Sequence, residues 1–199
     1  MIPGYKLRYK GEMIMDYKKA LNDLVGKDEM VSVFCNPDDE YKSCCGWIVA
    51  VSDEYFIMKS LTFDGYADGF LLRHFNEIFR IDRNCEYEQR LMFLYSELNQ
   101  KHPSFDVFGE DLLVTFFEYA RNNGLVVGVG VRDYSEKSIY GFVKEIDCEN
   151  QTLTFVDLND NGKETGGEYL ITFDSVKRAS ISSEDEVKLQ LLNRGFNAQ

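Results

Sequence analysis

The feature that most constrains the fold is a repeat inside the sequence. Three segments of the first half recur in the same order in the second half: Gly46–Val51 as Gly141–Ile146, Asn76–Ile81 as Asp174–Ala179, and Glu86–Leu94 as Glu184–Leu192. The last pair keeps both its charges and its helical apolar period. Because a repeat defines the architecture before any single residue is interpreted, we expect two copies of one unit, near residues 14–98 and 110–193.

The length of 199 residues suits either one large domain or two smaller ones, and the repeat favours two. We expect residues 1–99 to hold the first copy, with a strand or helix before it and a helix after it. A linker at residues 100–109 contains Pro103, and residues 110–199 hold a helix, the second copy and a C-terminal helix.

Short β-prone runs separated by turn residues predict five strands in each copy. In the first copy the runs are Val31–Cys35, Gly46–Val51, Tyr55–Phe63, Phe70–His74 and Ile78–Ile81. In the second copy they are Leu125–Val131, Ile139–Ile146, Thr152–Asp157, Tyr169–Phe173 and Val176–Ile181. A glycine in each second strand permits the sharp bend that closes a small sheet. The expected fold class is therefore mainly β with flanking helices (α+β), as two tandem five-stranded barrels.

Helices are predicted from apolar residues at helical spacing. One stripe, Tyr17–Val25, precedes the first barrel, and another, Leu112–Ala120, precedes the second and ends near Gly124. A third, Leu91–Leu98, lies between the two barrels.

A helix followed by five strongly bent strands, with glycine early in the second, resembles the Sm-like fold, a ring-forming barrel of RNA-associated proteins. The first motif of that family, a glycine between apolar residues with a following Asp, is similar to Tyr140–Asp147 and to Gly46–Asp53. Its second motif is similar to Leu72–Ile81. The resemblance implies candidate RNA- or ligand-binding residues: Asp53, Arg73, His74, Arg80 and Asp147.

The sequence departs from the Sm-like pattern where that family contacts RNA. The RNA-contacting Asn of the first motif has no counterpart at Phe56 and Ile57. The Arg-Gly step of the second motif is Arg73-His74 in one copy and Thr172-Phe173 in the other. These changes imply an altered RNA-base pocket in the first copy and none in the second, and an SH3-like barrel remains an alternative for each unit.

The charge of the chain also bears on nucleic-acid binding. With 34 acidic and 22 basic residues, the net charge of -12 repels phosphate backbones and disfavours nucleic acid as a partner. A local patch of Arg73, Arg80 and Arg83 near one end of the first barrel is the feature that favours RNA.

One segment satisfies the calcium-loop pattern, with oxygen-bearing side chains at positions 1, 3, 5 and 12 and glycine at position 6. The four candidate metal ligands are Asp157, Asn159, Asn161 and Glu168. An EF-hand requires a helix on each side of such a loop, whereas both flanks here are strand-like. The alternative is a hairpin turn rich in Asn, Asp and Gly.

No catalytic constellation is visible. The two histidines, His74 and His102, are not joined to cysteines by any paired spacing that would support zinc. The five cysteines show no disulfide framework, which favours reduced thiols in a cytoplasmic chain. No signal peptide and no segment of transmembrane length is predicted, so we expect no association with a membrane.

These observations favour a non-enzymatic binding or adaptor protein that recognises a protein partner, or associates with itself, through exposed strand edges. RNA binding is the first alternative. A metal-dependent enzyme or a calcium-binding protein is the second, with calcium as the one cofactor that the sequence suggests; otherwise we expect none.

Overall fold

The structure is a computed structural model that describes residues 10–36, 41–131 and 138–197, with side chains in 16–36, 41–131 and 138–196. Its α-helices are α1 (Lys10–Asn22), α2 (Glu86–Glu97), α3 (Leu112–Asn122) and α4 (Glu184–Asn197). The first five strands are β1 (Val31–Phe34), β2 (Ser43–Val51), β3 (Tyr55–Leu61), β4 (Ala67–His74) and β5 (Arg80–Arg83). The other five are β6 (Val126–Val131), β7 (Ile139–Asp147), β8 (Thr152–Leu158), β9 (Glu164–Thr172) and β10 (Val176–Ile181). Two 3₁₀ turns, η1 (Phe75–Glu77) and η2 (Phe173–Ser175), precede β5 and β10.

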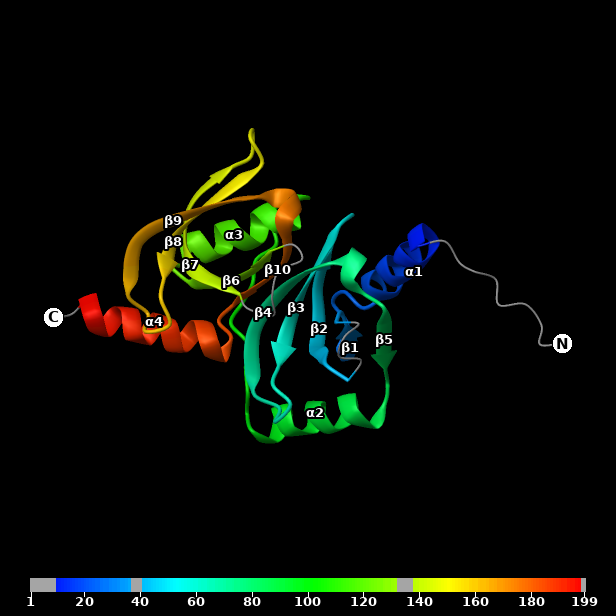
Figure 1. Cartoon of the computed structure of the whole chain (residues 1–199). Coiled ribbons are helices and arrows are strands. Elements are labelled where there is room, and N and C mark those ends of the chain that lie inside the picture. The colour runs from blue at the N-terminus through cyan, green and yellow to red at the C-terminus, as the bar shows by residue number, and fades with distance from the viewer. Residues whose placement is uncertain (1–9, 37–40, 132–137, 198–199) are drawn as a thin grey trace.

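All ten strands belong to one antiparallel sheet, in the order β5-β1-β2-β3-β4-β10-β6-β7-β8-β9. The prediction of a mainly β chain with flanking helices is confirmed. The prediction of two closed barrels is not confirmed, because the sheet is open and β4 pairs with β10 of the other half (Figure 1). The two outer strands of this sheet are β5 and β9.

The two halves have the same internal order, β5-β1-β2-β3-β4 and β10-β6-β7-β8-β9. They also share the places where the strand register shifts. These shifts are Ile48/Ala50 in β2 and Val143/Glu145 in β7, then Lys59/Leu61 in β3 and Val156/Leu158 in β8. A bulge bends a strand and increases its twist, so both halves curve at matching positions.

Glycine is required where the second strand of each half passes its neighbour. A Cβ atom at Gly46 would lie 1.9 Å from the carbonyl oxygen of Lys59, and one at Gly141 would lie 2.4 Å from that of Val156. Any larger residue would force the strands apart. The glycines that the sequence assigned to bending are thus also needed for close backbone approach.

Each half ends in a helix whose third residue is a buried glutamate. Both carboxylates accept a hydrogen bond from a serine hydroxyl and another from the backbone N–H of the residue just before their helix: Glu88 from Ser32 and Cys85, and Glu186 from Ser180 and Ser183. Burial raises the pKa of Glu186. The helices α2 and α4 lie at the same end of their respective halves (Figure 1).

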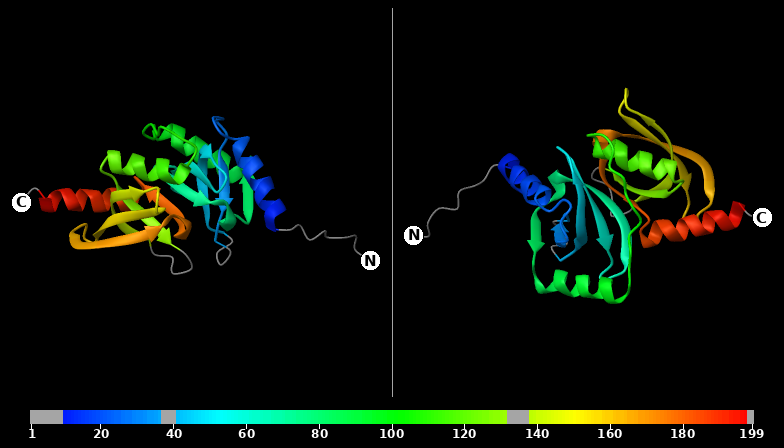
Figure 2. Two further views of the ribbon diagram at one scale, coloured as in Figure 1. Left: turned by 90° about the horizontal axis from the view of Figure 1, so that it is seen from above. Right: turned by 180° about the vertical axis from the view of Figure 1, so that it is seen from behind.

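The largest core is shared by the two halves. Helix α3 packs on β7 of the second half and also contacts β3 and β4 of the first (Figure 2). Phe70 and Leu72 of β4 are buried in the same cluster as Phe116 and Phe117 of α3. The side chain of Leu72 has no exposed surface.

The junction of β4 with β10 joins the halves. In this antiparallel pairing Phe70 lies opposite Ile181, and Leu72 lies opposite Ala179. Gly69 adopts a φ of +65°, and a Cβ atom there would lie 2.0 Å from the carbonyl oxygen of Ile181. This close contact and the shared core make the junction a packed interface.

Candidate functional site

Arg73, the central residue of the expected RNA-binding patch, points into the first half of the sheet. Its Nη2 donates to the Sγ of Cys44 at 3.1 Å, and its Nη1 lies 3.9 Å from a carboxylate oxygen of Glu77. Its Nε is buried without a hydrogen-bond partner. The side chain is only 16% exposed, so the guanidinium does not present a surface cation to RNA.

His74, the neighbouring candidate, has a structural role. Its Nδ1 accepts a hydrogen bond from the backbone N–H of Asn76 at 3.0 Å, which caps η1. Its ring packs edge-on against Tyr55, with centroids 4.9 Å apart. Burial, helped by the charge of Lys177, lowers the pKa of His74 to about 4. At neutral pH the imidazole is therefore uncharged.

The other three candidates for ligand binding each have a local partner. Asp53 is exposed and pairs with Lys18, which lowers the pKa of its carboxyl. Arg80 forms a two-pronged contact with Asp82, and Asp147 accepts two hydrogen bonds from Asn150. Arg83 likewise pairs with Glu29, its Nε lying 3.0 Å from the carboxylate. The structure therefore places these residues in separate local networks, and RNA binding stays a prediction.

The calcium-loop segment forms the hairpin between β8 and β9, which is the alternative that the sequence left open. The carboxylate of Asp157 accepts from the hydroxyl of Thr165 at 2.6 Å, and that of Glu168 contacts Lys144 Nζ at 2.6 Å. The side chain of Asn159 accepts from the backbone N–H groups of Asn161 and Lys163. In the described part of the chain, no three His, Cys, Asp or Glu side chains gather where they could hold a metal ion.

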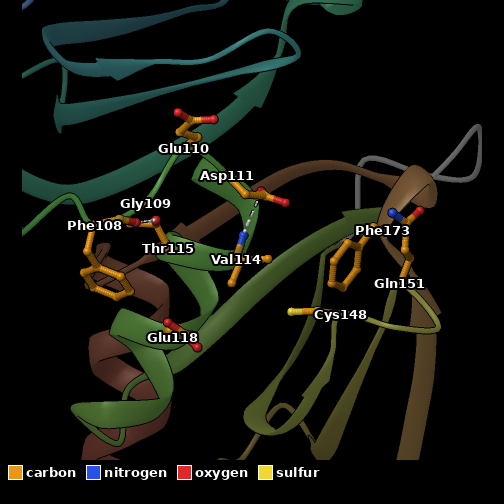
Figure 3. Close-up of a pocket in the computed structure, with 10 residues that line it drawn as sticks. All are labelled: Phe108, Gly109, Glu110, Asp111, Val114, Thr115, Glu118, Cys148, Gln151 and Phe173. Carbon is orange, nitrogen blue, oxygen red and sulfur yellow. Dashed lines mark hydrogen bonds between the residues drawn. The ribbon is translucent and has the colours of Figure 1, made fainter.

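A pocket that the sequence analysis missed lies beside the start of α3 (Figure 3). Its volume is about 340 Å³, and its lining residues are Phe108, Gly109, Glu110, Asp111, Val114, Thr115, Glu118, Cys148, Gln151 and Phe173. The lining holds three carboxylates and no lysine or arginine, which favours cationic groups. It escaped detection because its walls come from three distant segments: the linker with α3, the β7–β8 turn, and η2.

The acidic character of this region also affects Tyr55, whose hydroxyl donates to the carbonyl oxygen of Val176 at 2.9 Å. The pKa of Tyr55 is raised, first by burial and then by neighbouring carboxylates that include Asp111. Asp111 itself caps α3 by accepting from the N–H groups of Leu113 and Val114. One lining carboxylate is therefore already committed to the fold, and the other two belong to Glu110 and Glu118.

The second feature that stands out is the outer edge formed by β9. This strand pairs with β8 and is the last in the sheet order of the described residues. It exposes 71% of Leu170 and 40% of Tyr169. The register places Leu170 where the first half has Leu72, which is fully buried under α3 and beside β10. An apolar position that is covered in one half is thus bare in the other.

No family model, curated protein or solved structure matches the chain. None of the helices in the described segments is long and apolar enough to cross a membrane. Function is therefore inferred from the geometry of the pocket and of the β9 edge.

Proposed function

We propose that this chain is a non-enzymatic binding protein, built from two divergent Sm-like or SH3-like units, that takes up an extended segment of a protein partner along β9 by strand addition. The observation that carries the proposal is the exposed Leu170 on a nine-residue strand at the sheet edge. Backbone N–H and C=O groups on such an edge provide affinity, and pockets for alternate side chains provide specificity.

The two edges of the sheet differ in how well they are protected. Strand β5 has four residues, and its arginines are paired with Asp82 and Glu29. Short strands with charged side chains are the usual protection against unwanted pairing. Strand β9 is more than twice as long and presents a bare leucine. This difference supports β9 as the binding edge.

The β4–β10 junction supports an extended segment as the partner. Strand β4 holds the position in the first half that β9 holds in the second, and it is paired with β10. Leu72 of β4 lies opposite Ala179 there and is buried. An extended segment added to β9 in the same way would place a side chain beside Leu170, as Ala179 lies beside Leu72.

The proposal can be tested with a defined probe, a synthetic peptide of residues 174–183 of this chain, which contains β10. We expect the peptide to shift the backbone amide NMR signals of β9 in a saturable manner. Leu170→Lys should abolish the shifts. Leu191→Lys is a matched control, because Leu191 on α4 is also 61% exposed and is not part of the β9 strand.

Two results would contradict the proposal. In the first, millimolar peptide moves no amide of β9. In the second, Leu191→Lys weakens the shifts as strongly as Leu170→Lys, which means that the peptide is held by exposed apolar surface in general and not by the edge.

A further inference from the structure

The outward face of β9 carries both an apolar and an acidic residue. Side chains alternate between the two faces of a strand, so Glu168 and Leu170 point the same way. Glu168 is 47% exposed, and Leu170 is 71% exposed. The corresponding residues of β4, Phe70 and Leu72, are both apolar and both buried in the shared core. A partner that suits β9 must therefore differ from β10 at one position.

That position can be identified from the register of the junction. Strand β10 places Ala179 opposite Leu72 and Ile181 opposite Phe70. When the same register is applied to β9, Ala179 lies opposite Leu170, an apolar match, but Ile181 lies opposite Glu168. A cationic side chain fits opposite a carboxylate better than isoleucine does, because opposite charges on facing strands stabilise the pair.

Glu168 retains the capacity to accept such a cation. It contacts Lys144 through one carboxylate oxygen, and both side chains are about half exposed. An exposed ion pair of this kind contributes little to stability and exchanges readily. A basic residue of a partner can therefore share or replace the contact with Lys144.

The surroundings of β9 also favour a positively charged partner. The strand ends at Thr172, and the next residue, Phe173, lines the pocket with the three carboxylates. A segment that runs antiparallel to β9 brings its N-terminal end to this side of the edge. The net charge of -12 further attracts basic segments over a longer range.

A second copy of the chain is a weaker candidate for the occupant. Its β9 contains Glu164 and Glu168 and no lysine or arginine that could face Glu168. Its other outer strand, β5, offers four residues to pair with the nine of β9. The two arginines of that edge are already paired with acidic neighbours. Two chains that each carry -12 also repel each other.

On the basis of the proposed function, we infer that the occupant of β9 is a basic, extended segment of another protein, with an aliphatic residue opposite Leu170 and a lysine or arginine opposite Glu168. The segment adds to the sheet as a strand. Its basic residues meet Glu168 and the carboxylates beyond the end of β9.

The test uses two forms of the 174–183 peptide, one with Ile181→Lys and one with Ile181→Glu, titrated against the full chain by NMR. We expect the Lys form to bind roughly three- to ten-fold more tightly, from the difference between attraction and repulsion across one strand pair. Glu168→Gln should remove most of this preference, and 0.5 M salt should reduce it. Glu97→Gln, at an exposed residue that ends α2 in the first half, should leave it unchanged.

Each other outcome has a distinct meaning. Equal binding of both peptides at β9 would overturn the charge requirement and leave the proposed function standing. If neither peptide moves a β9 amide, the proposed function itself fails. A concentration-dependent dimer in sedimentation that Leu170→Lys dissociates would make a second copy the occupant, and the inference would be wrong.

Discussion

Leu72 and Leu170 occupy equivalent positions in the two halves, and substitutions at both give the most direct test of how the halves are joined. Leu72 has no exposed surface, whereas Leu170 is 71% exposed, although the two occupy the same position in their halves. We expect Leu72→Ala to lower the free energy of unfolding by about 2–5 kcal/mol, because it removes buried methyl groups and leaves a cavity under α3. Leu170→Ala should change it by less than about 0.5 kcal/mol.

For a chain of this length the first change corresponds to a fall in Tm of roughly 4–20 °C. Urea unfolding at two protein concentrations measures the free energy of unfolding of both variants. An unchanged m value shows that a substitution changes stability without changing the compactness of the native or denatured state. If Leu170→Ala proves as costly as Leu72→Ala, Leu170 is covered in solution. The description of β9 as a bare edge would then be wrong.

Two further predictions concern Gly69 and His74. Gly69→Ala should destabilise the fold by more than about 2 kcal/mol in urea unfolding, because Gly69 has a φ of +65° and the added Cβ would meet the backbone of β10. Gly167→Ala, at the matching position of β9, should cost less than about 1 kcal/mol, because its Cβ would meet only the rotatable hydroxyl of Thr165, at 3.2 Å. Similar costs for the two variants would argue against the β4–β10 contact. The pKa of His74 is about 4 in the folded chain, and it returns to about 6.5 on unfolding, so between these pH values the unfolded chain binds a proton that the folded chain does not. His74 therefore lowers the free energy of unfolding as pH falls from about 6.5 towards 4. His74→Asn, which can still cap η1, should therefore weaken the pH dependence of the free energy of unfolding in that window. If the difference in this free energy between wild type and variant does not change with pH there, the assignment is wrong.

The positions of the strands could be predicted from the sequence because period-two runs and turn residues are local signals. Each of the ten predicted strands has a counterpart in the structure. The largest error in bounds concerns β9, predicted from Tyr169 but found to begin at Glu164. Of the added residues, Glu-Thr-Gly-Gly-Glu, only Thr165 is β-prone, and all five are exposed at the edge of the sheet, where packing imposes little selection for β-prone side chains.

The pairing of the edges could not be predicted in the same way. The same strands and bends are compatible with two closed barrels and with one open sheet. What decides between them is the contact of β4 with β10, which joins residues more than a hundred positions apart, and the contact of β4 with the aromatic face of α3. No local pattern around Phe70 or Leu72 reports on that contact.

The candidate site was predicted less well than the strands. Arg73 and His74 were correctly placed on the fourth strand, but the resemblance to Sm-like proteins assigned them to ligand binding. Their side chains are engaged with Cys44 and Asn76. The β9 edge and the acidic pocket depend on which surfaces remain uncovered after folding, and this is a property of the whole sheet.

The β4–β10 junction also imposes an order of events on synthesis of the chain. Strand β4 leaves the ribosome more than a hundred residues before β10, which is the last strand along the chain. At typical elongation rates, Phe70 and Leu72 wait roughly five to twenty seconds for their partner. During that interval the nascent first half presents the kind of open edge that the finished molecule keeps only at its two outer strands. A chain cut within the linker would remain in this unfinished state permanently.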